Sequence, residues 1–328
     1  MQLALLLLIS FAPPLITFLI MILCSRKKGS IKSRMINTLS LNEEKGLFKQ
    51  GALWLSLFIP FGWFLSFGIT AWYEYSLSLN AEGFKKFLEI STLPLALLAI
   101  GLPASVLVAR FHATHQTARQ ISLSKEKNNI DAFYSHRKEF YSFFDRFPDL
   151  NYLGVFEASF KVHPSLYTTL YSGTPEQGAP KLNIDKLQEM LKEITKIRDN
   201  LNNLFVESVV EVQREEYLFA CHTILNLSIE IADTSIRKQL ITKGFEGKYS
   251  NTSGSGFTRT LGRTSTEVIA AYRYMREYMM NICLCVGHKH TFLHQGYEHI
   301  DIDISFLTIN PKGPAVERVI QHLMTTEI

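Results

Sequence analysis

The first third of the chain alternates long apolar stretches with short polar loops. Three stretches contain no Asp, Glu, Lys or Arg: residues 3–24, 51–73 and 90–109. A helix of about 20 apolar residues crosses the roughly 30 Å hydrocarbon core of a bilayer, so each stretch is long enough to span it. Trp54 and Trp72 stand near the ends of the second stretch, where indole rings favour the lipid headgroups. We therefore predict two or three transmembrane helices, and an interfacial first stretch is the alternative to three spans.

Beyond this region the apolar positions recur at helical spacing. Residues 110–147 contain neither Pro nor Gly, and phenylalanines recur along them until Pro148 ends the run. The spacing predicts one helix that leaves the membrane and continues into the rest of the chain. A second long helix is expected over 184–205, and a third over 207–241 with a possible break at 213–216.

The C-terminal part contains a loop signal, a helix signal and a strand signal. Residues 243–263 are rich in Gly and Ser and predict a mobile loop. Thr264 and Glu267 have the spacing of a capping box, which predicts a helix over 267–294. Apolar and polar residues alternate over 300–306, as in a short strand.

Together these patterns predict a mainly α-helical protein. We expect a transmembrane region over 1–109, a membrane-exit helix over 110–147, and a helical cytoplasmic domain over 148–328 with at most one short strand pair.

The charges predict the orientation in the membrane. Seven Lys or Arg residues lie in 25–50, including Arg26, Lys27 and Lys28, but only two lie in 74–89. Because cytoplasmic loops carry the excess of Lys and Arg, we expect the N-terminus outside and everything after Arg110 in the cytoplasm. From Arg110 onward there are 25 basic and 25 acidic residues, a balance that argues against a non-specific polyanion binder.

The apolar stretches contain no ionisable side chain for a proton relay or voltage sensor. Each contains proline, and small residues recur four apart, a spacing that allows close helix packing. Intramolecular packing and self-association into a pore both fit this pattern. The residues that we assign to membrane packing are Trp54, Gly62, Trp72, Gly101 and Ser105.

A group of Cys and His residues is the densest set of potential metal ligands. On a continuous helix, Cys283, His290 and His294 would share one face. The H-E-x-x-H arrangement is absent because Thr291 occupies the position of the general base, and there is no C-x-x-C pair. We keep these three residues as weak metal candidates and expect no metal, no cofactor and no enzymatic activity.

Two further charged groups have an ordinary interpretation and a functional one. Asp301 and Asp303 would lie on one face of the expected strand, either as solvated edge positions or as cation ligands. Four arginines, by contrast, form either solvated helix faces or a specific partner surface: Arg259, Arg263, Arg273 and Arg276.

The membrane-exit stretch has a distinctive composition. It reads RFHATHQTARQ from Arg110, and then places Asn128, Asn129, Phe133, His136 and Phe140 along the same helix. This pattern resembles the membrane-bound abortive-infection proteins of bacteria, and more narrowly the transmembrane effectors encoded beside retron reverse transcriptases. The resemblance covers residues 51–147 by sequence and the remainder only by architecture. A rigid polar stalk is the alternative interpretation.

The resemblance implies a toxic effector of anti-phage defence in the bacterial inner membrane. A complex of reverse transcriptase with non-coding RNA and DNA would hold it silent, and its release would damage the membrane. Such effectors usually have two spans, whereas residues 3–24 add a third here. The alternatives are a non-toxic membrane scaffold or sensor and a membrane-anchored metal-dependent hydrolase. We expect self-association and no direct sequence-specific nucleic-acid binding. The regulatory candidates are Arg110, His112, His115, Gln116, Arg119, Asn129 and His136.

Overall fold

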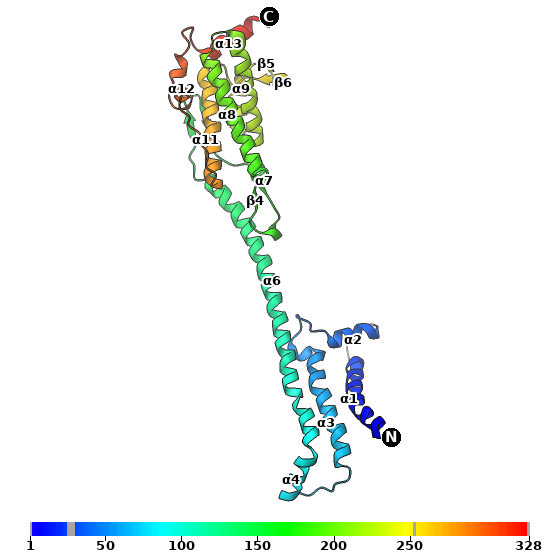
Figure 1. Ribbon diagram of the computed structural model, residues 1–328. Helices are drawn as coiled ribbons and strands as arrows, with labels where there is room; N and C mark the ends of the chain where they lie inside the picture. The colour runs from blue at the N-terminus through cyan, green and yellow to red at the C-terminus, as the bar shows by residue number, and fades with distance from the viewer. Residues whose placement is uncertain (1, 25–29, 252–253, 327–328) are drawn as a thin grey trace. The chain divides into compact units, whose positions relative to one another are not determined.

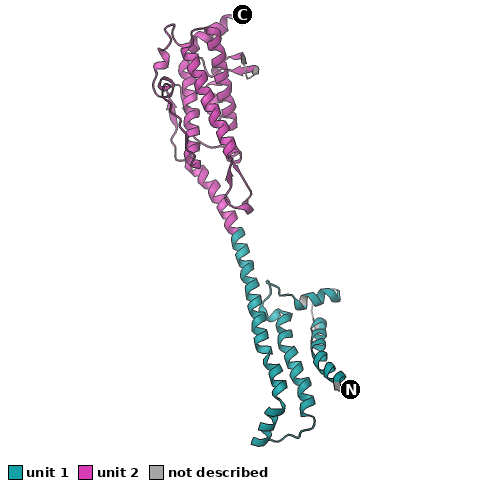
Figure 2. Cartoon of the chain, viewed as in Figure 1, with its two compact units in different colours: residues 1–126 teal, residues 127–328 magenta. Residues whose placement is uncertain are grey.

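The computed structural model describes residues 2–24, 30–251 and 254–326. The basic residues Arg26, Lys27 and Lys28, which contribute to the expected orientation, lie outside these ranges. The chain divides into two compact units, residues 1–126 and 127–328 (Figure 2).

The first unit consists of helices joined by short connections. Their bounds are α1 (Gln2–Cys24), α2 (Ile31–Leu39), the 3-10 turn η1 (Leu47–Lys49), α3 (Gly51–Trp72), α4 (Ala81–Ile90), α5 (Thr92–Ala99) and the first part of α6 (Gly101–Phe144) (Figure 1). Within the described ranges, three helical stretches are long and apolar enough to cross a membrane: α1, α3, and the stretch that begins with α5 and runs on into α6. The expected apolar helices are therefore present, including the one near the N-terminus.

Helix α3 packs against both α1 and α5. A side chain on Gly62 would place its Cβ 2.9 Å from the Cβ of Pro13 in α1, so the two backbones approach closely there. The indole nitrogen of Trp63 donates to the carbonyl oxygen of Ser10 over 2.8 Å. Small residues and one indole hydrogen bond thus define the contact between the first two apolar helices.

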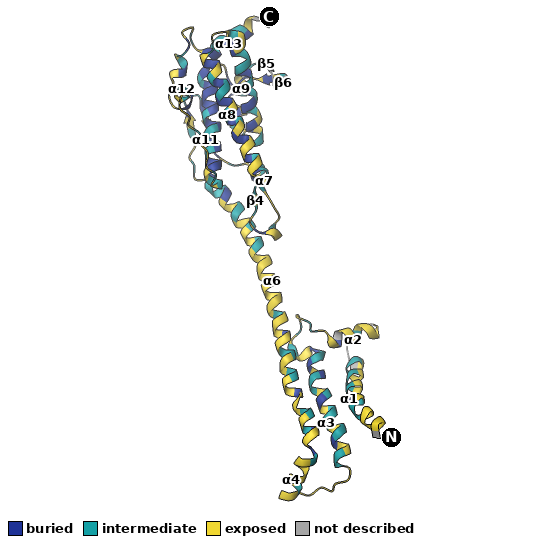
Figure 3. Cartoon of the chain, viewed as in Figure 1, coloured by how far each residue is buried: buried dark blue, intermediate teal, exposed yellow. Residues whose placement is uncertain are grey.

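Helix α6 extends from Gly101 to Phe144 without interruption. The expected exit helix over 110–147 is thus one helix with the second half of the third apolar stretch, and it ends three residues early. Residues 117–128 are all exposed, which Figure 3 shows as a yellow segment of this helix. Its last turns belong to the second unit, where Phe140 and Phe144 are buried.

The second unit is a helical bundle with three small antiparallel strand pairs. The helices are α7 (Pro164–Leu170), α8 (Ile184–Val206), α9 (Val210–Glu230), α10 (Ser235–Gln239), α11 (Ser265–Val286), α12 (Glu298–Asp301) and α13 (Ala315–Thr326), with 3-10 turns η2 (Pro175–Gln177), η3 (Ile241–Lys243) and η4 (Ser305–Leu307). The strand pairs are β1 (Leu150–Tyr152) with β2 (Phe156–Ala158), β3 (Tyr171–Ser172) with β4 (Lys181–Leu182), and β5 (Glu246–Asn251) with β6 (Gly254–Arg259).

The core of this unit lies between α8, α9, α11 and α13 (Figure 3). Apolar residues at helical spacing on α8 account for one wall, and Leu187, Leu201 and Leu204 are fully buried. Helix α11 supplies Tyr272, Tyr274 and Tyr278, whose rings are also buried among the aromatic residues. The core is therefore continuous and unusually rich in tyrosine.

The mainly α-helical fold is confirmed, and the expected helix over 184–205 is α8. The strand content is higher than expected, since the described part of the chain forms three strand pairs instead of at most one. Most of the loop expected over 243–263 is the β5–β6 hairpin, whose residues alternate between buried and exposed positions. The helix expected over 207–241 ends at Glu230 and has no break at 213–216.

Two further expectations near the C-terminus are wrong. Helix α11 begins after the expected Thr264 cap but ends at Val286 instead of residue 294, because Gly287 adopts a left-handed conformation (φ +70°) that terminates it. The strand expected over 300–306 is replaced by α12 and a 3-10 turn. The expected alternation of buried apolar and exposed polar residues does not occur, because Asp301 is buried while Ile302 and Ile304 are exposed.

Candidate functional site

The residues assigned to membrane packing have different roles in the first unit. Trp54 donates from its indole nitrogen to the carbonyl oxygen of Phe48, and Trp72 donates to the hydroxyl of Ser91, at 2.9 and 2.8 Å. Gly62 allows the close approach to α1 described above. Gly101 has only ordinary contacts, since a Cβ there would lie 3.5 Å from Pro60. The Ser105 hydroxyl donates within its own helix to the Leu102 carbonyl, so nothing assigns it to helix association.

One packing residue was missed by the sequence pattern. A Cβ on Gly68 would meet the Trp72 ring at 2.4 Å, so the indole folds back over this glycine. The ring of Trp72 also lies beside Phe64 and Phe87, with centroid distances of 5.5 and 5.8 Å. The spacing of four between Gly68 and Trp72 was the available signal. This end of the unit carries a cavity of about 610 Å³ that is lined by residues between Trp72 and Ile90.

Three regulatory candidates on α6 lie within reach of the loop before α3 or inside the first unit. The Gln116 side chain donates to the Glu43 carbonyl at 3.3 Å, and His115 lies 4.0 Å from the Glu43 carboxylate. His112 is 3% exposed, and neither ring nitrogen has a hydrogen-bond partner among the described residues. Arg110 and Arg119 are exposed on the same helix.

The other two candidates belong to the second unit and hold a neighbouring segment. The Asn129 side chain donates to the Glu176 carbonyl at 2.7 Å. His136 lies 3.0 Å from the Tyr167 hydroxyl through Nδ1, and its ring meets Tyr171 edge-on at 4.7 Å. These contacts attach the segment from α7 to β4 to the end of α6. The seven candidates therefore do not form one site, because they divide between the two units.

A small hollow opens beside His136. It has a volume of about 250 Å³, and its lining combines aromatic rings with the polar ends of His136, Glu139, Arg146 and Cys285. Burial raises the pKa of the Cys285 thiol to about 11, so this sulfur is protonated at neutral pH and a poor nucleophile. The hollow offers shape and aromatic surface but no activated group.

The weak metal candidates do not lie on a common helical face. Cys283 is within α11, whereas His290 and His294 follow its end. The His294 Nδ1 accepts from the guanidinium of Arg198, which occupies the lone pair that a metal would need. Within the described ranges no three His, Cys, Asp or Glu side chains are placed to hold a metal ion.

The two aspartates also separate. Asp301 is buried and accepts from the Tyr272 hydroxyl at 2.8 Å and from Arg276 at 2.7 Å. Asp303 accepts from the Ser305 hydroxyl in an exposed turn. Arg273 donates to the Ile300 carbonyl at 2.8 Å. Arg273 and Arg276 therefore attach the segment around α12 to α11, rather than forming a solvated face.

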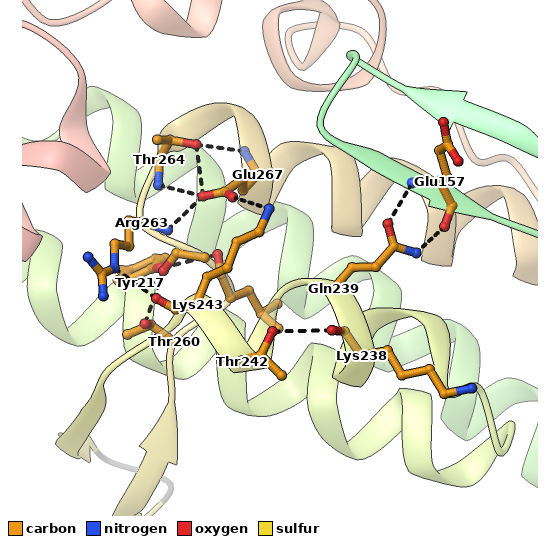
Figure 4. Close-up of polar contacts among 12 residues, drawn as sticks. Glu157, Tyr217, Lys238, Gln239, Thr242, Lys243, Thr260, Arg263, Thr264 and Glu267 are labelled. Atoms are coloured by element: carbon orange, nitrogen blue, oxygen red, sulfur yellow. Dashed lines mark hydrogen bonds and ion pairs between the residues drawn. The ribbon is translucent and has the colours of Figure 1, made fainter.

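A polar network fixes the base of the β5–β6 hairpin (Figure 4). Glu267 accepts from the Arg263 and Thr264 backbone amides at 2.7 and 3.1 Å, and pairs with Lys243 at 3.2 Å. Burial raises the pKa of Glu267, but these donors outweigh it and hold the pKa below its usual value. The Thr260 hydroxyl accepts from the Phe245 backbone amide at 2.8 Å. The hairpin is therefore attached to the bundle at a defined position.

Comparison with other proteins adds no further residue to this description. No protein-family model, no curated protein and no solved structure matches the chain.

Proposed function

We propose that this protein is a membrane-embedded effector of bacterial anti-phage defence that damages the inner membrane when an inhibitory partner releases it. The observation that carries the proposal is helix α6, which is continuous from the third apolar stretch to the buried aromatic residues of the second unit. A bound partner can act on the membrane segments through such a helix. The sequence resemblance of the exit stretch supports the same function.

The proposed topology places three spans in the inner membrane and the second unit in the cytoplasm. It is supported by the apolar stretches 3–24, 51–73 and 90–109, which contain no Asp, Glu, Lys or Arg, and by the excess of Lys and Arg in the first loop. With this topology the exposed face of α6, including Arg110 and Arg119, is available to a cytoplasmic partner. We propose that this partner is a reverse transcriptase with its RNA and DNA.

Damage would arise from displacement or self-association of the spans. No ring of charged side chains can form inside them, so an opening must come from altered packing around the proline-containing helices. The join between α5 and α6 at Ile100 is a natural point of change, because the last carbonyl groups of α5 are next to a glycine and close to Pro103. A partner that favours the closed state by a few kcal/mol suppresses opening.

A non-enzymatic mechanism without a cofactor completes the proposal. The thiols of Cys283 and Cys285 have pKa values raised by burial to about 11, and His294 already accepts from Arg198. These groups are therefore poorly suited to nucleophilic or metal-assisted hydrolysis.

Growth and membrane potential in bacterial cells test this function. The full chain should depolarise cells before growth stops, and co-expression of the neighbouring genes of its locus should prevent this. Gly101→Leu should reduce depolarisation because a large side chain meets Pro60, whereas Gly101→Ala fits the 3.5 Å contact and should not. Equal protein levels are required for both variants.

Two outcomes would contradict the proposal. Full-length protein that accumulates in the membrane without depolarising cells, with or without its neighbours, would favour a scaffold or sensor. Growth arrest with an intact membrane potential would favour an enzymatic or inhibitory activity in the cytoplasm.

A further inference from the structure

The β5–β6 hairpin has two chemically different faces. Its inner face packs on α9: a side chain on Gly247 would meet Leu218 at 2.8 Å, and the Tyr249 ring lies 4.8 Å from that of His222. The outer face consists of the exposed residues Glu246, Lys248, Phe257 and Arg259. Because strand side chains alternate between faces, the buried inner residues fix which side chains point outward.

The outer face and its surroundings are positively charged. Residues 237–263 contain six Lys or Arg and one acidic residue, although the second half of the protein as a whole is balanced. Among the described residues, Lys248 and Arg259 have no carboxylate within ion-pairing distance; Glu246 is the cross-strand neighbour of Arg259. The Arg214 guanidinium donates to the Lys248 carbonyl at 2.9 Å, but it also lies 3.7 Å from the Glu215 carboxylate, which balances its charge.

An exposed aromatic ring lies between these basic side chains. Phe257 is 70% exposed, directly across from Lys248 and two residues from Arg259 on the same strand. A large apolar side chain in such a position contributes nothing to the core of its own domain. Proteins that bind single strands contact the phosphates with Lys and Arg and stack the bases on aromatic side chains. The hairpin presents both on one surface.

We propose that the outer face of the β5–β6 hairpin binds single-stranded nucleic acid without sequence specificity. Phe257 stacks with a base, while Lys248 and Arg259 contact the adjacent phosphates. Membrane binding fits less well because, among the residues of this face whose side chains are described, Phe257 is the single apolar one, and membrane affinity scales with buried apolar area. An acidic peptide would leave the ring without a stacking partner. The proposal is independent of toxicity and would hold equally for a scaffold.

Fluorescence anisotropy on the full chain in neutral-lipid nanodiscs tests this site. The probe is a labelled oligothymidylate, and heparin serves as a polyanion without bases. Phe257→Ala should weaken oligothymidylate binding by about tenfold and leave heparin binding unchanged, since stacking contributes only with bases. Phe257→Tyr should retain the affinity because it keeps the ring.

Charge variants provide the second arm. The double variant Lys248→Glu with Arg259→Glu should weaken the binding of both oligothymidylate and heparin. For oligothymidylate, it should also lower the slope of log affinity against log salt concentration by about 1.4, the value for two phosphate contacts to a single strand. Lys181→Glu with Lys192→Glu makes the same change in charge at exposed positions elsewhere in the unit and should leave affinity within about twofold.

Near-ultraviolet circular dichroism of the tyrosines checks that each variant is folded. The proposal is overturned if folded Phe257→Ala binds oligothymidylate as tightly as the unmodified chain, or if both double variants lose affinity equally. No binding at low salt, or the same loss of heparin binding in Phe257→Ala, would also contradict it. Attachment of the hairpin to anionic nanodiscs, with no oligothymidylate binding, would identify a lipid surface instead.

Discussion

The two units place their apolar side chains in opposite ways. In the most apolar part of α1, only 6% of the residues are buried within the protein, and Leu19 is 61% exposed. In the second unit, Leu187, Leu201 and Leu204 have no exposed surface at all. A water-soluble helix with the exposure of α1 would leave a very large apolar surface unprotected. The difference indicates that the second unit supplies its own apolar environment, while the first depends on an external one.

The contacts that hold the helices together also differ between the two units. In the first unit, small residues allow close backbone approach, and indole groups donate to oxygen atoms of neighbouring segments. In the second unit, tyrosines and an ion pair are enclosed by the bundle. Packing and hydrogen bonding remain effective between helices in lipid, whereas the hydrophobic effect drives association only in water. Matched variants in the two units therefore test this difference.

The largest expected effect is all-or-none and concerns membrane topology. A reporter fused after Phe147 should be cytoplasmic, and one inserted in the 74–89 loop should be external, because the preceding loop carries seven Lys or Arg against two. Reporter activity and accessibility to an impermeant label measure this. An external reporter after Phe147 would reverse the orientation of both units.

Breaking the buried ion pair of the second unit should have the next largest effect. Arg276→Ala leaves the carboxylate of Asp301, whose side chain is 1% exposed, without its cation. The expected loss is about 3–5 kcal/mol in the free energy of unfolding. Lys86→Ala in the first unit removes an exposed pair with Glu89 and should cost about 0.5 kcal/mol or less.

Urea unfolding followed by near-ultraviolet circular dichroism separates these outcomes. All three tryptophans lie in the first unit, at positions 54, 63 and 72, so indole fluorescence reports on that unit alone. Similar losses in the two variants would show that Asp301 is not an enclosed charge.

Overpacking the contact between α1 and α3 should have an intermediate effect. Gly62→Ala places a methyl group 2.9 Å from Pro13 and should cost about 1–2 kcal/mol. Gly46→Ala has no described atom within 4 Å of the new group and serves as the control. Indole fluorescence during thermal unfolding in micelles detects the change, because the Trp63 indole donates to Ser10 of α1. If Gly62→Ala leaves the transition unchanged, the close approach of the two helices is wrong.

The smallest expected effect depends on pH. The pKa of Glu267 lies below its usual value, so its contribution is present above the unfolded pKa and lost as pH falls through the folded pKa. Glu267→Gln should therefore cost about 1 kcal/mol at neutral pH and progressively less in acid below about pH 4.5. Asp131→Asn, at an exposed position of α6 in the second unit, is the control. A difference that grows as pH falls would contradict the assigned direction.

Sequence patterns predicted those elements whose own residues specify them. The apolar stretches, α8 and the Thr264 capping box follow from spacing within about 20 residues. The end of α11 was also specified locally, since Gly287 is a C-terminal cap that the apolar pattern obscured. The hairpin was missed because Gly and Ser suggested a loop, although Lys248, Tyr249, Phe257 and Thr258 alternate on its strands.

The remaining features depend on residues that are distant in sequence. Asp301 is buried because Tyr272 and Arg276 on another helix donate to one of its carboxylate oxygens, which reverses the alternation expected around it. His136 contacts Tyr167 and Tyr171 only after α7 and β3 fold back onto α6. The charge on the hairpin is visible in the sequence, but the even balance of the whole domain conceals it. Local patterns could not place these side chains together.

In the proposed function, the membrane segments cause the damage and the second unit regulates them. The most direct test of this claim compares the membrane potential of bacterial cells that express the full chain with that of cells that express a chain lacking residues 1–109, at equal protein levels. The full chain should depolarise the cells, and the shortened chain should remain soluble and harmless because its core is complete without the spans. Growth arrest by the shortened chain, with the potential intact, would contradict the claim.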